Sequence, residues 1–600
     1  MKHRYNYFYC FILLLIFCIP AQGFSTLNYQ VVFNGAENHK TEELLRSASD
    51  LIRLQDHPPT TQAVLRRRAE ADIPLFTKVM QSLAHFNAKV DVKIDFAQTP
   101  IIIQILINPG PIYPFKNFKV TFAQPEVLSN CLTPDLLETI TPEDLGVAIG
   151  SAALPKTIIE SKEKLLFLLA KKGFPFAVIS KTDVIADQTA KDISVTLTVE
   201  SGPQICFGPL RITGNRCVKN CFFDTKVRWR EGSLYNIKKV ESTRNALEAS
   251  RLFSSVIITP ENPVNEQDAC VPMVIQVVES KHHSIGLGAS FTTQRGSGIT
   301  ADWETRNFRG VGERLSFNAN LWQETQEVTL LFVKPDFYQR GREFHGLLEY
   351  QYETTKGYTE SFLSLSGTIE RRVNCHLWLS YGLMFKQLNN TRSDNNGSYN
   401  LIKFPTQLRW TNVDSLLDPT EGYSIYFRFI PTLQVLRPQF AYGIATLTGT
   451  SYYALDAKGS VIFAAKGMFG TIQGSPRRII PPSERFYAGS ETTLRGYAYR
   501  TVSPLNDKYK PIGGRSLMVY SGELRVHASK NFGFVGFYDF GNVYSSPLPE
   551  LTRPLLHAVG LGVRYYTPVG PLRLDVAFPL NRRKHVDGFY QLYLSVGQAF

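Results

Sequence analysis

The stretch VGLGVRYYTPVGPLRLDVAF, residues 559–578, contains the pattern that decides the fold of the C-terminal half. Apolar residues occupy every second position on both sides of the turn-forming residues 567–571, and small or charged residues fill the positions between them. A period of two indicates β-strands with one apolar and one polar face. The same alternation recurs in residues 315–321 and 423–429, so many strands of this kind follow one another.

The alternating region extends over residues 281–600. Transmembrane β-strands take about 9–11 residues, alternate lipid-facing apolar with lumen-facing polar side chains, and close in even number. A water-soluble β-sheet protein would also alternate, and it remains the alternative. We predict an all-β, 16-stranded transmembrane β-barrel, because about 320 residues divide into segments of about 20 residues including turns.

The N-terminal half repeats one order of elements three times. Residues 104–111, 197–203 and 276–280 are strand-like runs closed by polar or Gly-Pro residues. A helical spacing of apolar residues, ended by two lysines and a glycine, precedes the second run. We therefore predict three α+β units, each built as strand, helices, strand, strand. Their expected boundaries are residues 24–110, 111–203 and 204–280.

The first residues indicate export. Basic residues at the start precede the apolar stretch Phe8–Ile19 and the small-residue site Ala21-Gln22-Gly23. This order is typical of a signal peptide, expected over residues 1–23. An uncleaved anchor helix is the alternative, but the apolar stretch is short for a membrane span.

The net charge of +13 is unevenly distributed. Residues 1–280 carry 30 basic and 28 acidic side chains, whereas residues 281–600 carry 35 and 24. The basic excess of the C-terminal half can face anionic lipid or line a lumen. Export, together with the absence of any nucleic-acid-binding motif, indicates that nucleic acid is not a partner.

Four cysteines lie close together in the third unit: Cys206, Cys217, Cys221 and Cys270. In an oxidising compartment they can form two disulfides, with three possible connectivities. Zinc is the alternative, but a C-x3-C spacing without a nearby histidine is not typical of a zinc site. We predict no metal site and no cofactor. Since the chain also lacks nucleophile-elbow, zinc-protease and phosphate-loop motifs, we predict no enzymatic activity.

Three further stretches resemble one known family. Residues 485–497, RFYAGSETTLRGY, are similar to the loop-six motif of the outer-membrane assembly superfamily that includes BamA, TamA and the two-partner secretion transporters. Residues 537–543 resemble its strand-thirteen motif, and residues 560–571 resemble its near-terminal signature. The three α+β repeats resemble POTRA domains, and the C-terminal half resembles the bacterial surface antigen barrel. One departure is Ala488-Gly489, where the family often has paired glycines.

The resemblance implies roles for particular residues. Loop six would fold into the lumen, where Arg495 pairs with Asp539. The loop-six core in this chain is Leu494, Arg495, Gly496 and Tyr497.

We also hypothesise a weak lateral seam between the first and last barrel strands, because interior glycines weaken strand pairing. The simpler interpretation is that the glycines make room for lumen side chains. The seam residues are Gly286, Gly288, Gly597 and Phe600.

Three POTRA units are typical of the TamA type. The implied function is outer-membrane protein assembly, in which POTRA edges bind β-barrel or autotransporter-like clients and the seam inserts them. The expected localisation is the bacterial outer membrane, with the POTRA domains in the periplasm. Implied partners are unfolded clients, an inner-membrane-anchored TamB-like protein, and outer-membrane lipid or lipopolysaccharide. The alternatives are a two-partner transporter that exports one dedicated polypeptide through the lumen, a component of a lipid-transport complex, and a passive porin.

Overall fold

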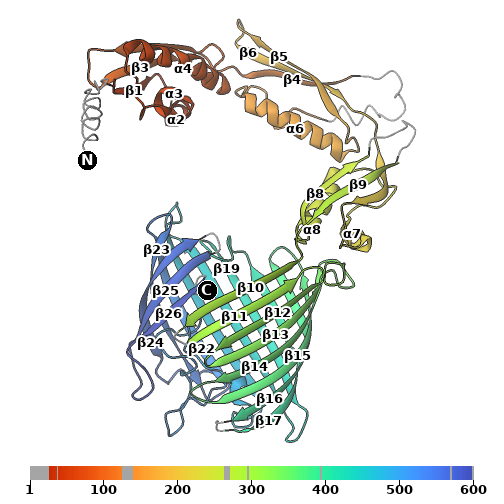
Figure 1. Cartoon of the computed structure of the whole chain (residues 1–600), viewed down its shortest axis with the longest axis vertical. Helices are drawn as coiled ribbons and strands as arrows, with labels where there is room; N and C mark the ends of the chain where they lie inside the picture. The colour runs from red at the N-terminus through yellow and green to blue at the C-terminus, as the bar shows by residue number, and fades with distance from the viewer. Residues whose placement is uncertain are drawn as a thin grey trace, which may run out of the picture. The chain divides into compact units, whose positions relative to one another are not determined.

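The computed structural model describes residues 26–36, 38–123, 140–261, 270–292, 296–391, 395–567 and 570–596 (Figure 1). The expected signal peptide and the seam residues Gly597 and Phe600 lie outside these ranges. Among the described residues, no helix has both the length and the apolar character that crossing a membrane requires.

Three small α+β units occupy the N-terminal half, each with one three-stranded sheet. In every unit the strand that comes last in the chain is the central strand of the sheet. In the first two units the central strand runs parallel to the first strand and antiparallel to the second. The predicted order of strand, helices, strand, strand is confirmed for the first and third units, and the described part of the second unit has one helix between its first two strands.

The elements of the first unit are β1 (Tyr29–Asn34), α2 (His39–Ala48), α3 (Asp50–Arg53), α4 (Gln62–Ser82), β2 (Lys89–Asp95) and β3 (Ile101–Asn108). Those of the second are β4 (Phe115–Phe122), α6 (Pro155–Lys171), β5 (Val178–Asp187) and β6 (Asp192–Glu200). Those of the third are β7 (Cys206–Thr213), α7 (Asn220–Lys226), α8 (Ile237–Glu248), β8 (Phe253–Pro260) and β9 (Cys270–Glu279).

Each of the first two units has its own apolar core between its described helices and its sheet. In the first unit, alternate isoleucines of β3 are buried against one face of α4. In the second, alternate residues of β6 pack with the buried face of α6. On these buried faces a strand with apolar residues at every second position packs against a helix with apolar residues at helical spacing. Both spacings can be read in the sequence, which is why the units could be predicted.

The third unit contains one disulfide, between Cys206 on β7 and Cys270 on β9. Their Cα atoms are 4.4 Å apart on two strands of one sheet, which is within the range that a disulfide bridges. Cys217 and Cys221 are exposed and free, so the expectation of two disulfides is wrong for the second pair. The backbone of Cys217 is instead bound by the carboxylate of Glu279.

Glu279 ends β9 and fixes the loop before α7. Its carboxylate accepts hydrogen bonds from the backbone N–H groups of Arg216 at 2.7 Å, Cys217 at 3.0 Å and Val218 at 2.9 Å. Burial raises the pKa of Glu279, but these donors and His282 outweigh it and lower the pKa to about 2. The carboxylate is therefore ionised and holds the loop at neutral pH.

Contacts between residues divide the chain into two compact units. The first contains residues 1–211, 228–242 and 259–274. The second joins residues 212–227 and 243–258 to residues 275–600.

The C-terminal half is one antiparallel sheet in which the strands β10 to β26 follow chain order. Figure 1 shows these strands tilted side by side around a curved surface. The first nine are β10 (His283–Thr292), β11 (Gly296–Thr305), β12 (Arg314–Trp322), β13 (Thr325–Lys334), β14 (Arg342–Thr354), β15 (Thr359–Arg372), β16 (Leu377–Thr391), β17 (Gly397–Lys403) and β18 (Thr406–Thr411). The remaining eight are β19 (Gly422–Gln434), β20 (Phe440–Ala454), β21 (Val461–Gly474), β22 (Ser516–His527), β23 (Phe532–Tyr544), β24 (Leu556–Thr567), β25 (Gly570–Pro579) and β26 (Gln591–Val596).

The sheet is apolar on its exposed face and polar on its buried face. On β25, Leu572 and Leu574 are each 43% exposed, whereas Arg573 is 2% and Asp575 is 0% exposed. A water-soluble protein does the reverse, because burying a charge costs free energy unless the charge is paired. This inside-out pattern is typical of a transmembrane β-sheet, whose outer face contacts lipid.

Candidate functional site

The connection between β21 and β22, residues 475–515, lies against the buried face of the sheet. Apart from the short 3-10 helix η1 (Pro482–Glu484) it has no regular structure. Three isolated bridges fold it back on itself: Phe486 with Gly514, Ala488 with Val502, and Leu505 with Pro511. Leu494 and Tyr497 are buried in an apolar cluster with side chains of β22, β23 and β24. We call this connection the lumen loop.

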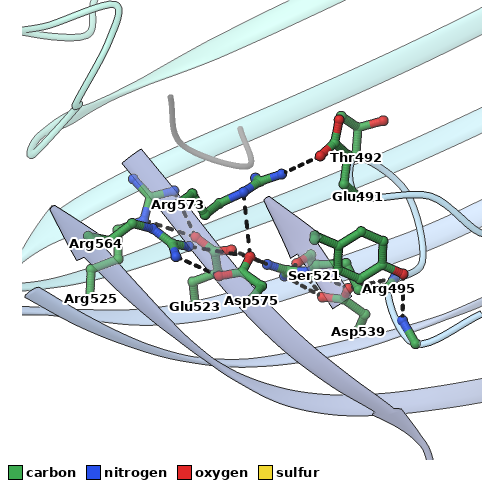
Figure 2. Close-up of polar contacts among 12 residues, drawn as sticks. Glu491, Thr492, Arg495, Ser521, Glu523, Arg525, Asp539, Arg564, Arg573 and Asp575 are labelled. Carbon is green, nitrogen blue, oxygen red and sulfur yellow. Dashed lines mark hydrogen bonds and ion pairs between the residues drawn. The ribbon is translucent and has the colours of Figure 1, made fainter. Parts of the chain in front are cut away.

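Arg495 is the central side chain of the site, and it is 1% exposed. Its guanidinium donates to both carboxylate oxygens of Asp539 at 2.7 Å, and its backbone N–H donates to the same carboxylate at 3.0 Å. It also donates to Ser521 Oγ at 2.8 Å and to Glu523. The ring of Phe537 lies 3.6 Å from the guanidinium carbon, measured to the ring centroid. All three guanidinium nitrogens thus donate to side chains of β22 and β23, and Figure 2 shows Ser521, Glu523 and Asp539 around Arg495.

The strand register brings the acceptors together. Ser521 and Asp539 are directly opposite each other on β22 and β23, and Ser521 Oγ donates to Asp539 Oδ1 at 2.5 Å. Glu523 lies two positions further along β22, on the same face. A one-residue shift of β22 would turn Ser521 and Glu523 to the lipid face, and the same shift of β23 would turn Asp539 outward. The ion pair and the register therefore depend on each other.

Arg495 belongs to a larger network of charges on β22, β23, β24, β25 and the lumen loop (Figure 2). Arg564 and Arg573 are directly opposite each other, and the carboxylate of Asp575 contacts both guanidinium groups. Arg573 also pairs with Glu491 of the lumen loop at 2.8 Å, and Arg525 pairs with Glu523 at 2.8 Å. Four arginines and four carboxylates therefore balance one another in this network. They are Arg495, Arg525, Arg564, Arg573, Glu491, Glu523, Asp539 and Asp575.

Gly496 links the lumen loop to the last described strand. Its backbone has φ +87°, and a Cβ there would lie 3.0 Å from the Cβ of Ala558. Only glycine combines this conformation with so close an approach. The N–H of Gly496 donates to Tyr593 Oη on β26 at 3.0 Å. The neighbouring Tyr497 hydroxyl donates to the backbone oxygen of His557 at 2.9 Å.

A second group of charges holds the other end of the lumen loop. Glu484 of η1 is 3.1 Å from Lys386 Nζ and 2.5 Å from Lys403 Nζ. Lys386 also lies 3.5 Å from Glu360. Further along the loop, Arg500 pairs with Glu353 at 3.2 Å. The lumen loop is thus fixed to β14–β17 as well as to β22–β25.

Sequence reasoning missed this second anchor, and it missed Glu523 and Asp575. Polar residues at inward-facing strand positions were the available signal, since Lys386, Lys403 and Asp575 all interrupt apolar strands. That signal shows which face a charge is on, but not which partner it meets.

The two seam glycines that are described lie on β10. Gly286 is opposite Asp302 and Gly288 is opposite Thr300. A Cβ at Gly286 would collide with the carboxylate of Asp302, and one at Gly288 would lie 2.7 Å from Thr300 Oγ1. These contacts agree with the simpler interpretation that the glycines make room for neighbouring side chains.

Comparison with known proteins identifies related chains. Residues 307–600 match the family model of the Omp85 superfamily domain. The outer membrane protein assembly factor BamA of Neisseria meningitidis serogroup B is 23% identical over 498 residues, which cover 72% of this chain and 61% of that relative. A SAM50-like protein of Schizosaccharomyces pombe is 23% identical over 469 residues, which cover 71% of this chain and 97% of that relative.

Among solved structures, BamA from Haemophilus ducreyi lacking POTRA domains 1–3 superposes with a TM-score of 0.68 at 18% identity. The superposition covers 80% of this chain and 99% of that chain, and it shows a shared fold.

Replacing Asp539 with alanine is expected to destabilise the protein by about 3–5 kcal/mol, because the buried Arg495 loses the partner that binds two of its nitrogens. Denaturant unfolding in detergent measures this loss, and trypsin cleavage within residues 475–515 reports release of the lumen loop. Glu550→Ala is the matched control, since it removes a carboxylate from a solvent-accessible pair with Arg553 and should leave the stability nearly unchanged. Equal stability of the two variants would contradict the assigned role.

Glu484→Gln is expected to release the other end of the lumen loop, because Lys386 and Lys403 then face each other with less negative charge. Adding Lys403→Met removes the surplus charge and should restore part of the stability, with a coupling of about 0.5–3 kcal/mol. Trypsin cleavage after Arg477 and Arg478 measures the release. Strictly additive effects of the two substitutions would show that the buried pair does not anchor the loop.

Proposed function

The chain is a member of the Omp85 superfamily, and on this premise we propose that it is an outer-membrane assembly factor that inserts β-barrel or autotransporter-like clients. It is an outer-membrane protein whose POTRA units lie in the periplasm. The Neisseria relative is an outer membrane protein assembly factor, which supports the proposed activity. This chain spans about three fifths of that relative's length.

We infer that the spanning sheet closes into a 16-stranded barrel. β17 and β18 both pair with β16 on one side and with β19 on the other, so the two share one position in the sheet, interrupted at residues 404–405. The 17 named strands then fill 16 positions, an even number that suits a closed transmembrane barrel. Closure would bring β10 beside β26, and these two strands contact each other.

One observation carries the functional proposal: within the described residues, β10 and β26 are the two end strands of the sheet, and their ladder partners are β11 and β25. A strand edge presents unpaired N–H and C=O groups, which is a template for another strand. We propose that a client strand adds to this seam and that the barrel then releases it sideways into the membrane.

The lumen loop supports a role in holding the seam. Arg495 fixes the loop to β23 through Asp539, and the next residue, Gly496, donates to Tyr593 on β26. The loop therefore links a stable interior strand to the strand at the seam. We propose that loss of the Arg495 anchor lets β26 move.

The POTRA units are proposed to receive clients before insertion. We place them at residues 24–110, 111–203 and 204–280, with the barrel at 281–600, and each three-stranded sheet falls within one of these ranges. The first two strands of every unit lie at sheet edges, where an extended client can pair. Three units favour the TamA type, with its inner-membrane-anchored TamB-like partner and its contacts to outer-membrane lipid.

Depletion of this protein in its own cells is the first test of the function. Quantitative proteomics of the outer membrane and the culture medium should show loss of several unrelated barrels or autotransporters, and a wild-type copy should restore them. Loss of one secreted protein with intact barrels would instead support a two-partner transporter. An unchanged protein profile with altered lipid composition would support the lipid-transport alternative.

Crosslinking the seam is expected to stop client insertion. One cysteine is placed at residues 284–288 and one at 591–595, scanning the register, in a chain whose Cys131, Cys217, Cys221 and Cys375 are serine. Insertion of a β-barrel client into vesicles should fall to background after oxidation and recover with reductant. The matched control is a cysteine pair at Leu330 and Leu348, which are opposite each other on β13 and β14. Full insertion by the seam-crosslinked protein would refute the lateral gate.

A further inference from the structure

Two segments far apart in the sequence meet where the third POTRA unit joins the barrel. One is the loop that precedes α7 and contains Cys217, and the other is the end of β9 with the linker into β10. Glu279 ends β9, and His282 directly precedes β10. The Glu279 carboxylate holds the loop through three backbone N–H groups, and His282 Nε2 lies 3.2 Å from Glu279 Oε2.

These contacts bring three metal-ligating side chains together. One ligand atom each from Cys217, Glu279 and His282 lies within 4.8 Å of the other two. Zinc binds thiolate, imidazole and carboxylate at about 2.0–2.3 Å, so ligand atoms around a tetrahedral ion are about 3.6 Å apart. The 3.2 Å between His282 and Glu279 already meets this spacing. A shift of the Cys217 sulfur within the 4.8 Å limit would place the third ligand at a corner of the same tetrahedron.

We propose that Cys217, Glu279 and His282 form a binding site for a zinc-like transition-metal ion, with water in the fourth position. The donor set of one sulfur, one nitrogen and one oxygen suits zinc better than calcium or magnesium, which take oxygen ligands. This inference goes beyond the proposed assembly function and does not depend on it.

The carboxylate and the imidazole are already positioned for such an ion. The Oε1 atom of Glu279 accepts the shortest backbone hydrogen bonds. Oε2 accepts only a longer one, from Cys217 N–H at 3.2 Å, and it faces His282. His282 is 11% exposed, and its second ring nitrogen, Nδ1, is buried without a hydrogen-bond partner among the described residues. Cys217 is a free, exposed thiol, so an ion can reach the site from solvent.

The C-x3-C spacing did not indicate this site, because its ligands come from residues 62 and 65 positions after Cys217 in the chain. Cys221, the other cysteine of that spacing, is not part of the cluster. The disulfide between Cys206 and Cys270 uses the two remaining cysteines of the third unit, which leaves Cys217 available as a ligand.

A bound ion would brace the joint between the third unit and the seam strand. The backbone oxygen of Cys217 accepts a hydrogen bond from Asn307 at 3.1 Å, and Lys219 N–H donates to the backbone oxygen of Gly310 at 2.8 Å. Both partners lie in the connection between β11 and β12. The ion would therefore join the loop before α7 to the start of β10 at a place where the loop already contacts the barrel.

The test is a cobalt titration of the full-length protein in detergent, with its free thiols reduced beforehand and its disulfide intact. We expect one Co²⁺ per chain, with a thiolate-to-cobalt charge-transfer absorption that Zn²⁺ abolishes by competition. Cys217→Ser should remove this absorption and weaken binding by more than about 100-fold, because even outer-shell changes cost about 10- to 100-fold. His282→Gln should weaken binding similarly. Cys221→Ser is the matched control and should bind as the parent does.

A second measurement needs no variant of the cluster. Zn²⁺ should slow alkylation of Cys217 by a maleimide, while alkylation of Cys221 and Cys375 continues at its original rate. Unchanged alkylation of Cys217 at saturating Zn²⁺, or Co²⁺ binding by Cys217→Ser as tight as that of the parent, would overturn the proposal. Loss of the absorption in Cys221→Ser would overturn it as well, since that cysteine lies outside the cluster.

Discussion

The ion pair between Arg495 and Asp539 is the interaction on which the C-terminal half depends. A buried guanidinium costs several kcal/mol unless its donors are satisfied, and here Asp539, Glu523 and Ser521 satisfy them. Those acceptors face inward together only in one register of β22 and β23. The position of the lumen loop therefore depends on the register of β22 and β23, and the neutralisation of the buried charges depends on both.

That requirement follows from the inside-out character of the sheet. Lipid accepts apolar side chains and satisfied backbone groups, so the strands direct leucine, valine and tyrosine outward and direct charges inward. Inward charges must then be neutralised within the protein, because each unpaired one would be costly. The lumen loop supplies part of this neutralisation, with Glu491 and Arg495 at one end and Glu484 at the other.

The same loop connects the buried face of the sheet to its last described strand. The arginine anchors the loop to β23, and the adjacent glycine contacts β26 through the hydroxyl of Tyr593. At the other end of the sheet, β10 begins one residue after His282, beside the cluster of Cys217, Glu279 and His282. Each end strand of the sheet is thus attached to a polar cluster, β26 to the network around Arg495 and β10 to the cluster that ends β9.

Much of this organisation was predictable because it is local. The period of two in residues 559–578 predicted membrane strands, and the strand, helix and strand order of the first half predicted three α+β units. Arg495 and Asp539 were named only because the residues around them resemble a family. The second anchor had no such motif, and its partners Lys386 and Glu484 are 98 residues apart.

The sequence by itself therefore determined which residues form strands and helices and which face of each strand is polar. It did so because those properties repeat along neighbouring residues. Only the tertiary structure decided which inward charges meet, that Cys206 bonds to Cys270 and not to Cys217 or Cys221, and that Cys217 lies beside Glu279 and His282. These pairings depend on strand register and on loops folding back over the sheet, and neither leaves a periodic trace in the chain.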